Sequence, residues 1–188
     1  MKISVITACF NSAATIADTL ESVRAQTHPD IEHLIIDGAS RDDTLGVVAR
    51  HGERVARVVS EPDRGIYDAL NKGISLATGE VAAILHADDL YAGPDVLAAV
   101  AALFESSGAD CVYGDLLYVD RDHPDKIIRY WRSGTYTPSS FLWGWMPPHP
   151  AFFVRREVYA RHGGFDLRLK SAADYELMLR LLYRHGLS

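Results

Sequence analysis

The sequence predicts an α/β protein with a mainly parallel sheet, and three observations favour this fold class. Short apolar runs alternate along the first half of the chain with segments whose apolar residues recur at helical spacing. The run 81–85 is apolar throughout, which is typical of a strand buried on both faces of a parallel sheet. An acidic cluster follows this run directly, and ligands bind at the carboxyl ends of strands in open α/β sheets.

The first half of the chain alternates strand and helix in a regular order, which implies right-handed crossovers. Each predicted helix has one apolar face, and the loops between elements carry Asn, Ser, Asp, Pro and Gly. Strands are predicted over residues 2–8, 31–37, 57–60 and 81–85, and helices around Ile16, Leu20 and Val23, through about His51, and around Ile66, Leu70, Ile74 and Ala77.

The second half is predicted to be less regular. A helix follows Pro94 and runs through Phe104, because proline suits the first turn of a helix. The other expected elements are a strand over 110–114, a hairpin of 116–119 and 126–130, a Pro-rich loop over 133–150, a strand over 151–154, a helix to about His162 and an amphipathic helix over 172–185. The chain stops with no closing strand, so we interpret it as one domain, 1–188, truncated at its C-terminus.

Composition favours an ordinary globular protein. The chain has 188 residues, of which 48% are hydrophobic and 23% charged, and this length suits one domain. No apolar run approaches the ~18 residues of a membrane-spanning helix, and the first residues lack the layout of a signal peptide. Cys9 and Cys111 lie in apolar runs, so we expect reduced thiols and a cytoplasmic setting.

Charge is distributed unevenly along the chain. Residues 1–120 hold 8 Lys and Arg against 19 Asp and Glu, and residues 121–188 hold 11 against 6. The acidic half argues against nucleic-acid binding, and a phosphorylated ligand there would need a cation or backbone N–H groups. The basic half either faces an anionic acceptor or the inner face of a membrane as a peripheral contact, or is a scattered solvated surface.

Two adjacent carboxylates, Asp88 and Asp89, end the central apolar run. Their repulsion is offset if they bind a divalent cation such as Mn²⁺ or Mg²⁺, which prefers oxygen ligands. The other interpretation is a simple turn, where Asp is common. The chain has no glycine-rich dinucleotide loop, no P-loop and no nucleophile elbow, so diphosphate binding would depend on a metal.

Several segments resemble one known family. The segments 5–11, 22–27, 36–42, 60–74 and 77–80, followed by 164–166 and 173–177, resemble a family 2 glycosyltransferase of the GT-A fold, in the order in which that family has them. The similarity is greatest to bacterial enzymes that make exopolysaccharide or lipid-linked oligosaccharide. It implies a Rossmann-like central sheet flanked by helices, a nucleotide-sugar-binding half over 1–115, and an acceptor-side half over 116–188 with C-terminal helices.

The resemblance also implies an activity and a role for individual residues. The activity is inverting transfer of a sugar from a nucleotide-sugar, with UDP favoured, to a saccharide or lipid-linked hydroxyl acceptor. His86 stands where the family has the first acid of its D-x-D motif. The implied roles are nucleotide binding by Thr7, Ala8, Asn11, Asp37 and Asp88, metal binding by Asp89 and Asp88, and general-base catalysis by Asp174.

Some assignments stay open at this point. His149 contacts the diphosphate or acceptor, or is structural, and Trp145, Trp143 and Phe141 stack on a sugar or lipid, or fill the core. A nucleotide-sugar-binding protein without turnover is an alternative function, suggested by His86. A nucleotidyltransferase is a weaker one, since the glycine-rich basic loop expected after the first strand is absent.

Overall fold

The computed structural model describes all residues from Met1 to Ser188. Its elements confirm the predicted alternation, and β2 has the predicted bounds. The elements are β1 (Ile3–Cys9), α1 (Ile16–Arg24), β2 (Ile31–Asp37), α2 (Thr44–His51), β3 (Val55–Ser60), α3 (Ile66–Leu76), β4 (Val81–Ile84), α4 (Val96–Ser107), β5 (Cys111–Tyr113), β6 (Leu116–Val119), β7 (Ile127–Trp131), β8 (Phe152–Arg155), α5 (Arg156–His162) and α6 (Ala173–Met178).

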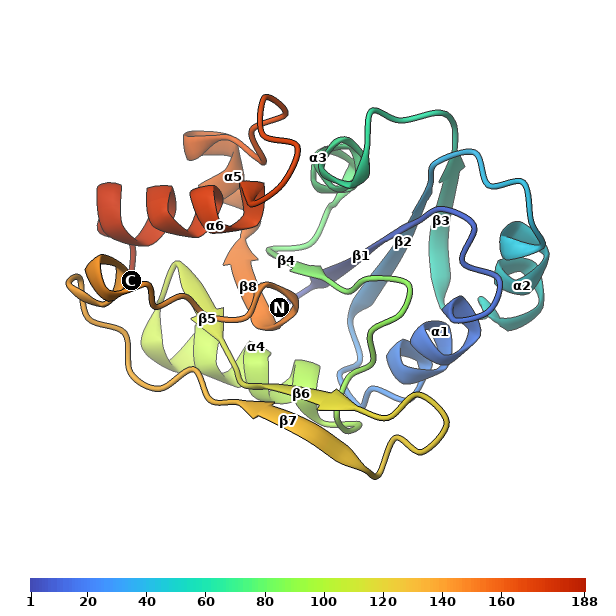
Figure 1. Ribbon diagram of the computed structural model, residues 1–188, viewed down its shortest axis with the longest axis horizontal. Helices are drawn as coiled ribbons and strands as arrows, with labels where there is room; N and C mark the ends of the chain where they lie inside the picture. The colour runs from blue at the N-terminus through green and yellow to red at the C-terminus, as the bar shows by residue number, and fades with distance from the viewer.

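The main sheet has six strands in the order β3-β2-β1-β4-β8-β5. The strands β3, β2, β1 and β4 are parallel to their neighbours, and only β8 runs antiparallel, between β4 and β5. The strands β6 and β7 pair with each other as a separate two-stranded ribbon, as the sequence predicted. Figure 1 shows this ribbon apart from the sheet, along the lower edge of the view.

Helices cover both faces of the sheet, which explains the uninterrupted apolar run of β4 (Figure 1). Ile84 on β4 packs in a cluster with residues of α3, α5 and α6, and Ala83 on the same strand packs in another with residues of α1 and α4. Successive residues of a strand point to opposite faces, so both faces of β4 need apolar side chains.

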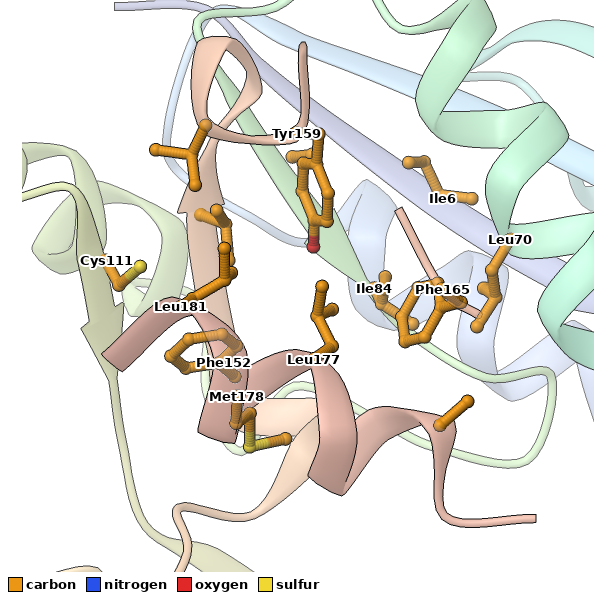
Figure 2. Packing of buried hydrophobic residues seen from close by; sticks show 14 of the residues in the cluster. Ile6, Leu70, Ile84, Cys111, Phe152, Tyr159, Phe165, Leu177, Met178 and Leu181 are labelled. Carbon is orange, nitrogen blue, oxygen red and sulfur yellow. The ribbon is translucent and has the colours of Figure 1, made fainter. Parts of the chain in front are cut away.

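The last helical segment packs on the sheet as its leucines predicted. Leu177, Leu181 and Leu182 are buried in the same cluster as Ile6 of β1 and Ile84 of β4. Figure 2 shows Leu177 and Leu181 among Phe152, Tyr159 and Ile84. This packing lays α6 beside the sheet.

The structure differs in one respect from the predicted helix over 172–185. Only α6 is α-helical, and Leu179–Arg184 continues as a π-helix in which the N–H of His185 bonds to the carbonyl of Arg180. The Arg180 guanidinium donates to the carbonyl of Gly164, 2.6 Å away, and to Glu176, which ties this turn to the preceding loop.

Three further observations complete the fold. Both cysteines are free and buried, as expected. The loop 133–150 contains two short 3₁₀ turns, Ser140–Trp143 and His149–Ala151. No helix combines the length and the apolar character that a membrane span requires.

Candidate functional site

A cavity of about 730 Å³ opens where β1 and β4 end. Its wall is formed by the loop after β1, the turn before α3, the residues after β4 and one side chain from the β6–β7 turn. The residues lining it are Ala8, Cys9, Phe10, Asn11, Ser12, Ala14, Thr15, Asp63, Gly65, Ile66, Ala69, His86, Ala87, Asp88 and Arg121. This is the edge at which the sequence predicted a ligand.

The loop after β1 is tied to the loop after β2 by side chains. Asn11 has a left-handed backbone (φ 50°), which asparagine tolerates better than most residues, and its N–H donates to the Ser40 hydroxyl. The N–H of Ser12 donates to Thr44, and that of Ala13 to Asp42. The backbone donors of this loop are therefore already engaged, and they form no anion cradle of the glycine-rich kind.

Thr7 and Asp37 do not line the cavity, although Ala8 and Asn11 do. The Thr7 hydroxyl is fully buried and lies 3.0 Å from Nε2 of His33. The Asp37 carboxylate accepts from the Ser60 hydroxyl, 2.6 Å away, and from the N–H of Ser40. Its contacts stabilise the loop on which Asn11 rests, so any contact of Asp37 with a nucleotide stays a prediction.

The acidic pair after β4 is divided between two environments. Asp88 is exposed and lines the cavity, next to His86 and Ala87. Asp89 is half-buried outside the cavity lining, where its N–H bonds to the carbonyl of His86 and its own carbonyl accepts from Thr19. Burial raises the pKa of the Asp89 carboxyl, and the nearby His86 opposes that rise. Asp88 is thus the acid with direct access to a ligand.

A divalent cation fits this cavity only in partnership with a ligand. No group of three or more His, Cys, Asp or Glu side chains is placed to hold a metal ion. Asp88 supplies one carboxylate, and the buried Nδ1 of His86 beside it has no hydrogen-bond partner. Mg²⁺ commonly takes one or two protein carboxylates and completes its shell with phosphate oxygens and water, which agrees with this arrangement.

The C-terminal segments reach the same region through aromatic contacts. The Tyr67 hydroxyl, in the first turn of α3, donates to Oδ1 of Asp174 at 3.1 Å. The Tyr67 ring stacks on the Phe165 ring with centroids 5.4 Å apart. The His149 ring also contacts Phe165, in an edge-on arrangement with centroids 5.7 Å apart. The ring of His149 lies 5.3 Å from that of His86 on the cavity wall. A series of side-chain contacts thus connects Asp174 to His86 on the cavity wall, and a shared role of Asp174 and Asp88 stays a prediction.

His149 is buried, and its Nε2 has no hydrogen-bond partner. Burial and, to a lesser extent, the neighbouring His86 lower the pKa of His149 to about 4, against the opposing effect of Asp174. The imidazole is consequently neutral near pH 7. Its position between His86 and Phe165 agrees with either of the roles predicted for it.

Trp145 packs among other aromatic rings instead of lining the cavity. Its Nε1 donates to the carbonyl of Ser133 at 2.6 Å, and its ring stacks on Tyr136 and meets Phe141 edge-on. Phe141 is buried in the same cluster, whereas Trp143 is 87% exposed. An acceptor contact by Trp145 stays a prediction, and its observed contacts are those of a core residue.

Most of the cavity residues were not singled out from the sequence as site residues, among them Phe10, Asp63, Ile66 and Arg121. Phe10 is 59% exposed, and Asp63 accepts from the N–H of Gly65, which holds the turn into α3. Ile66 begins that helix, and Arg121 arrives from the β6–β7 turn. The sequence signal for Asp63, Gly65 and Ile66 was their place in the segment 60–74, whereas the position of Arg121 depends on how the ribbon docks.

Comparison with known proteins places the chain in a family. The family model described as glycosyl transferase family 2 matches residues 4–172. An uncharacterized glycosyltransferase of Mycobacterium tuberculosis is 38% identical over 184 residues, covering 95% of this chain and 68% of that protein. A PGL/p-HBAD biosynthesis glycosyltransferase of Mycobacterium bovis is 33% identical over 182 residues, covering 94% and 68%.

Solved structures agree with this fold. Residues 1–349 of Staphylococcus aureus TarS, solved in complex with UDP, superpose with a TM-score of 0.77 at 23% identity, covering 96% of this chain and 54% of that one. The mannosyltransferase PcManGT from Pyrobaculum calidifontis, in complex with GDP-Man and Mn²⁺, gives a TM-score of 0.68 at 23% identity, covering 93% and 50%. The chain thus spans about half the length of these solved chains. Its sheet order, its cavity at the strand ends and the match over residues 4–172 identify the chain as a member of glycosyl transferase family 2, with the GT-A fold.

Proposed function

We propose that the protein transfers a sugar from a nucleoside diphosphate sugar to a hydroxyl group, with inversion at the anomeric carbon. The observation that carries this proposal is the series of side-chain contacts that connects Asp174, through Tyr67 and the rings of Phe165 and His149, to His86 on the wall that carries Asp88. The cavity has room for a nucleotide-sugar, since ligand pockets commonly measure about 300–1,000 Å³. A UDP-sugar is the favoured donor, and the complexes of TarS with UDP and UDP-GlcNAc support that choice.

The donor half of the site would bind the nucleotide along the loop after β1. Asn11, Ala8 and Phe10 would border the nucleoside, and Asp88 would face the ribose or a cation on the diphosphate. When bound, Mn²⁺ or Mg²⁺ neutralises the charge that develops on the leaving diphosphate. Asp88 would hold that cation. Asp89, which is half-buried outside the cavity lining, stays a second candidate ligand.

The acceptor half would supply the base. The Tyr67 hydroxyl donates to Oδ1 of Asp174, and Oδ2 would take the acceptor proton. As the acceptor oxygen bonds to the anomeric carbon, its proton passes to Asp174, and the bond to the diphosphate oxygen breaks on the opposite face. The nucleoside diphosphate leaves with that bonding pair.

The cellular role that we infer is assembly of a bacterial surface polysaccharide or glycolipid. The name of the relative from Mycobacterium bovis, which refers to PGL/p-HBAD biosynthesis, supports an acceptor of the saccharide or lipid-linked kind. A protein acting on a lipid-linked acceptor would work at the cytoplasmic membrane surface as a peripheral protein. The basic half, 121–188, would then face that surface.

The variant Asp174→Asn tests the function directly. It keeps the shape of the side chain and its hydrogen bond to Tyr67, but a neutral amide does not take up the proton of the attacking hydroxyl group. We expect donor affinity close to that of the wild type and transfer slower by ~10²-fold or more. The matched control is Asp18→Asn, since Asp18 is exposed on α1 and does not line the cavity.

The assay would use the full-length protein, a panel of nucleotide-sugars and NMR detection of the anomeric configuration of the product. Transfer by Asp174→Asn at the wild-type rate would rule out this base, and a product of retained configuration would rule out inversion. Donor binding with no turnover on any donor would favour the alternative of a nucleotide-sugar-binding protein.

A further inference from the structure

Only one Lys or Arg side chain lines the cavity, and it comes from an unexpected part of the chain. Arg121 lies in the turn between β6 and β7, whereas every other lining residue lies between positions 8 and 88. Arg121 is the first residue of the basic half, 121–188, and it brings a positive charge to a wall that also carries Asp63 and Asp88.

The turn that carries Arg121 is built by its own hydrogen bonds. Oδ1 of Asp120 accepts from the N–H of Asp122 and from that of His123, both at 3.1 Å. The N–H of Asp120 donates to the carbonyl of Lys126, which closes the turn at 3.0 Å. Lys126 also pairs with Oδ2 of Asp120 at 3.5 Å. The carboxylate of Asp120 is thereby engaged by other donors, and Arg121 forms no ion pair within the chain.

A single contact docks Arg121 on the cavity wall. Its Nη2 donates to the carbonyl of Ala14 at 3.1 Å, on the loop after β1. A guanidinium carries five N–H donors in a planar fork, so most of them remain for a ligand. The contact therefore positions the Arg121 guanidinium at the cavity wall and leaves most of its N–H donors for a ligand.

The rest of the wall supplies little to neutralise an anion. The N–H groups of Asn11, Ser12 and Ala13 are bonded to side chains of the neighbouring loop, and the two charged groups besides Arg121 are acids. A diphosphate bears at least two negative charges near pH 7, and one cation held by Asp88 would leave part of that charge unpaired. A bidentate Arg–phosphate contact is the strongest complement that the wall offers.

We infer that Arg121 binds the diphosphate of the donor, so that the β6–β7 ribbon forms part of the nucleotide site. This inference rests on the proposed function, because it takes the ligand to be a nucleoside diphosphate sugar. It also means that the nucleotide site extends beyond residues 1–115. Phosphate oxygens that bind the guanidinium connect the turn, through the ligand, to the loop after β1.

The test compares Arg121→Gln with the wild type by calorimetric titration of UDP and GDP, each with and without Mn²⁺. Glutamine retains an N–H that donates to the carbonyl of Ala14 but removes the charge. We expect diphosphate affinity to fall about 10- to 100-fold, the range of a hydrogen bond to a charged group. The diphosphate affinity of Arg121→Lys should fall less, because lysine keeps the positive charge and lacks only the planar fork of N–H donors. Raising the salt concentration should reduce the difference in diphosphate affinity between the wild type and Arg121→Gln, because salt screens the charge of the guanidinium.

The control is Arg132→Gln, one residue past the end of β7, since the Arg132 guanidinium stacks on Tyr130 at 4.9 Å and does not line the cavity. Uridine and guanosine, followed by thermal shift at millimolar concentration, should bind wild type and Arg121→Gln equally. Unchanged UDP and GDP affinity in Arg121→Gln would overturn the inference, and so would an equal loss for the nucleosides, which would indicate a damaged loop. If the wild type binds neither diphosphate, the proposed function fails together with the inference.

Discussion

The hydroxyl of Tyr67 donates to the carboxylate of Asp174 across 107 positions of the chain. Tyr67 follows the cavity residue Ile66 in the first turn of α3, and Asp174 lies at the start of α6. The bond therefore joins these two helices. Asn71 of α3 also ties this helix to the segment before α6, since its side chain exchanges two hydrogen bonds with the backbone of Phe165. The bond from Tyr67 is the one that reaches the carboxylate of Asp174, the proposed base, and it fixes the position of Oδ1.

Tyr67→Phe should slow sugar transfer while leaving donor binding intact. The phenyl ring keeps the stacking on Phe165, but Asp174 loses the donor that orients its carboxylate. We expect kcat to fall about 10-fold, the order of one lost hydrogen bond, with KM for the donor nearly unchanged. Steady-state kinetics would check this, and an increase in donor KM with constant kcat would contradict the positioning role.

Asp88→Ala should remove the dependence of nucleotide affinity on Mn²⁺ more completely than Asp89→Ala. Asp88 is exposed on the cavity wall, whereas Asp89 is half-buried outside the lining. Calorimetric titration of UDP with and without Mn²⁺ would measure the metal-linked gain in affinity in each variant. Equal gains in Asp88→Ala and the wild type would show that Asp88 holds no metal. A larger loss in Asp89→Ala would assign the metal to the second acid.

Glu32→Gln should destabilise the fold near neutral pH and much less in acid. Burial alone would raise the pKa of Glu32, but hydrogen bonds from Ser4, Thr78 and Lys2 outweigh it and lower the pKa to about 2. A carboxyl whose pKa is lower in the folded state stabilises that state above its unfolded pKa, near 4.5, and this contribution is lost as the pH falls toward 2.

Glutamine replaces one acceptor oxygen of Glu32 by an amide, so at least one of the donors is left without a partner. We expect a loss of about 2 kcal/mol in the free energy of unfolding at pH 7, from urea titration, and a smaller difference at pH 3. Glu53→Gln, at an exposed position with no such contacts, is the control. A difference between Glu32→Gln and wild type that is the same at both values of pH would refute the assignment.

Gly73→Ala should destabilise the protein although alanine favours helices. A Cβ at Gly73 would lie 2.3 Å from Cγ2 of Ile6, a fully buried residue of β1, so α3 would have to move away from the sheet. Overpacking of this kind costs about 1–3 kcal/mol, which exceeds the gain of about 1 kcal/mol in helix propensity. Thermal unfolding would show the loss. Gly93→Ala, with no atom within 4 Å of its Cβ, should be nearly neutral.

Several features followed directly from local sequence pattern. The strand Ile31–Asp37 was predicted with its observed bounds, because a run of apolar residues was bounded by turn residues on both sides. The burial of Leu177, Leu181 and Leu182 followed from their helical spacing. The π-helical turn after Met178 did not, since it depends on contacts between Arg180 and a loop that is distant in sequence.

The sequence by itself determined the order of strands and helices, the buried central strand and the acidic pair at its end. These features depend on residues within a few positions of one another, so periodicity and turn chemistry are enough to predict them. The tertiary structure alone decided which acid of the pair reaches the cavity, that Thr7 and Asp37 bond to neighbouring strands and loops, that Arg121 lines the cavity and that Asp174 bonds to Tyr67 of α3. Those outcomes depend on how the β6–β7 ribbon and α6 dock against loops that lie far away in the chain. Docking is a balance of packing and hydrogen bonding summed over many residues, which no local pattern encodes.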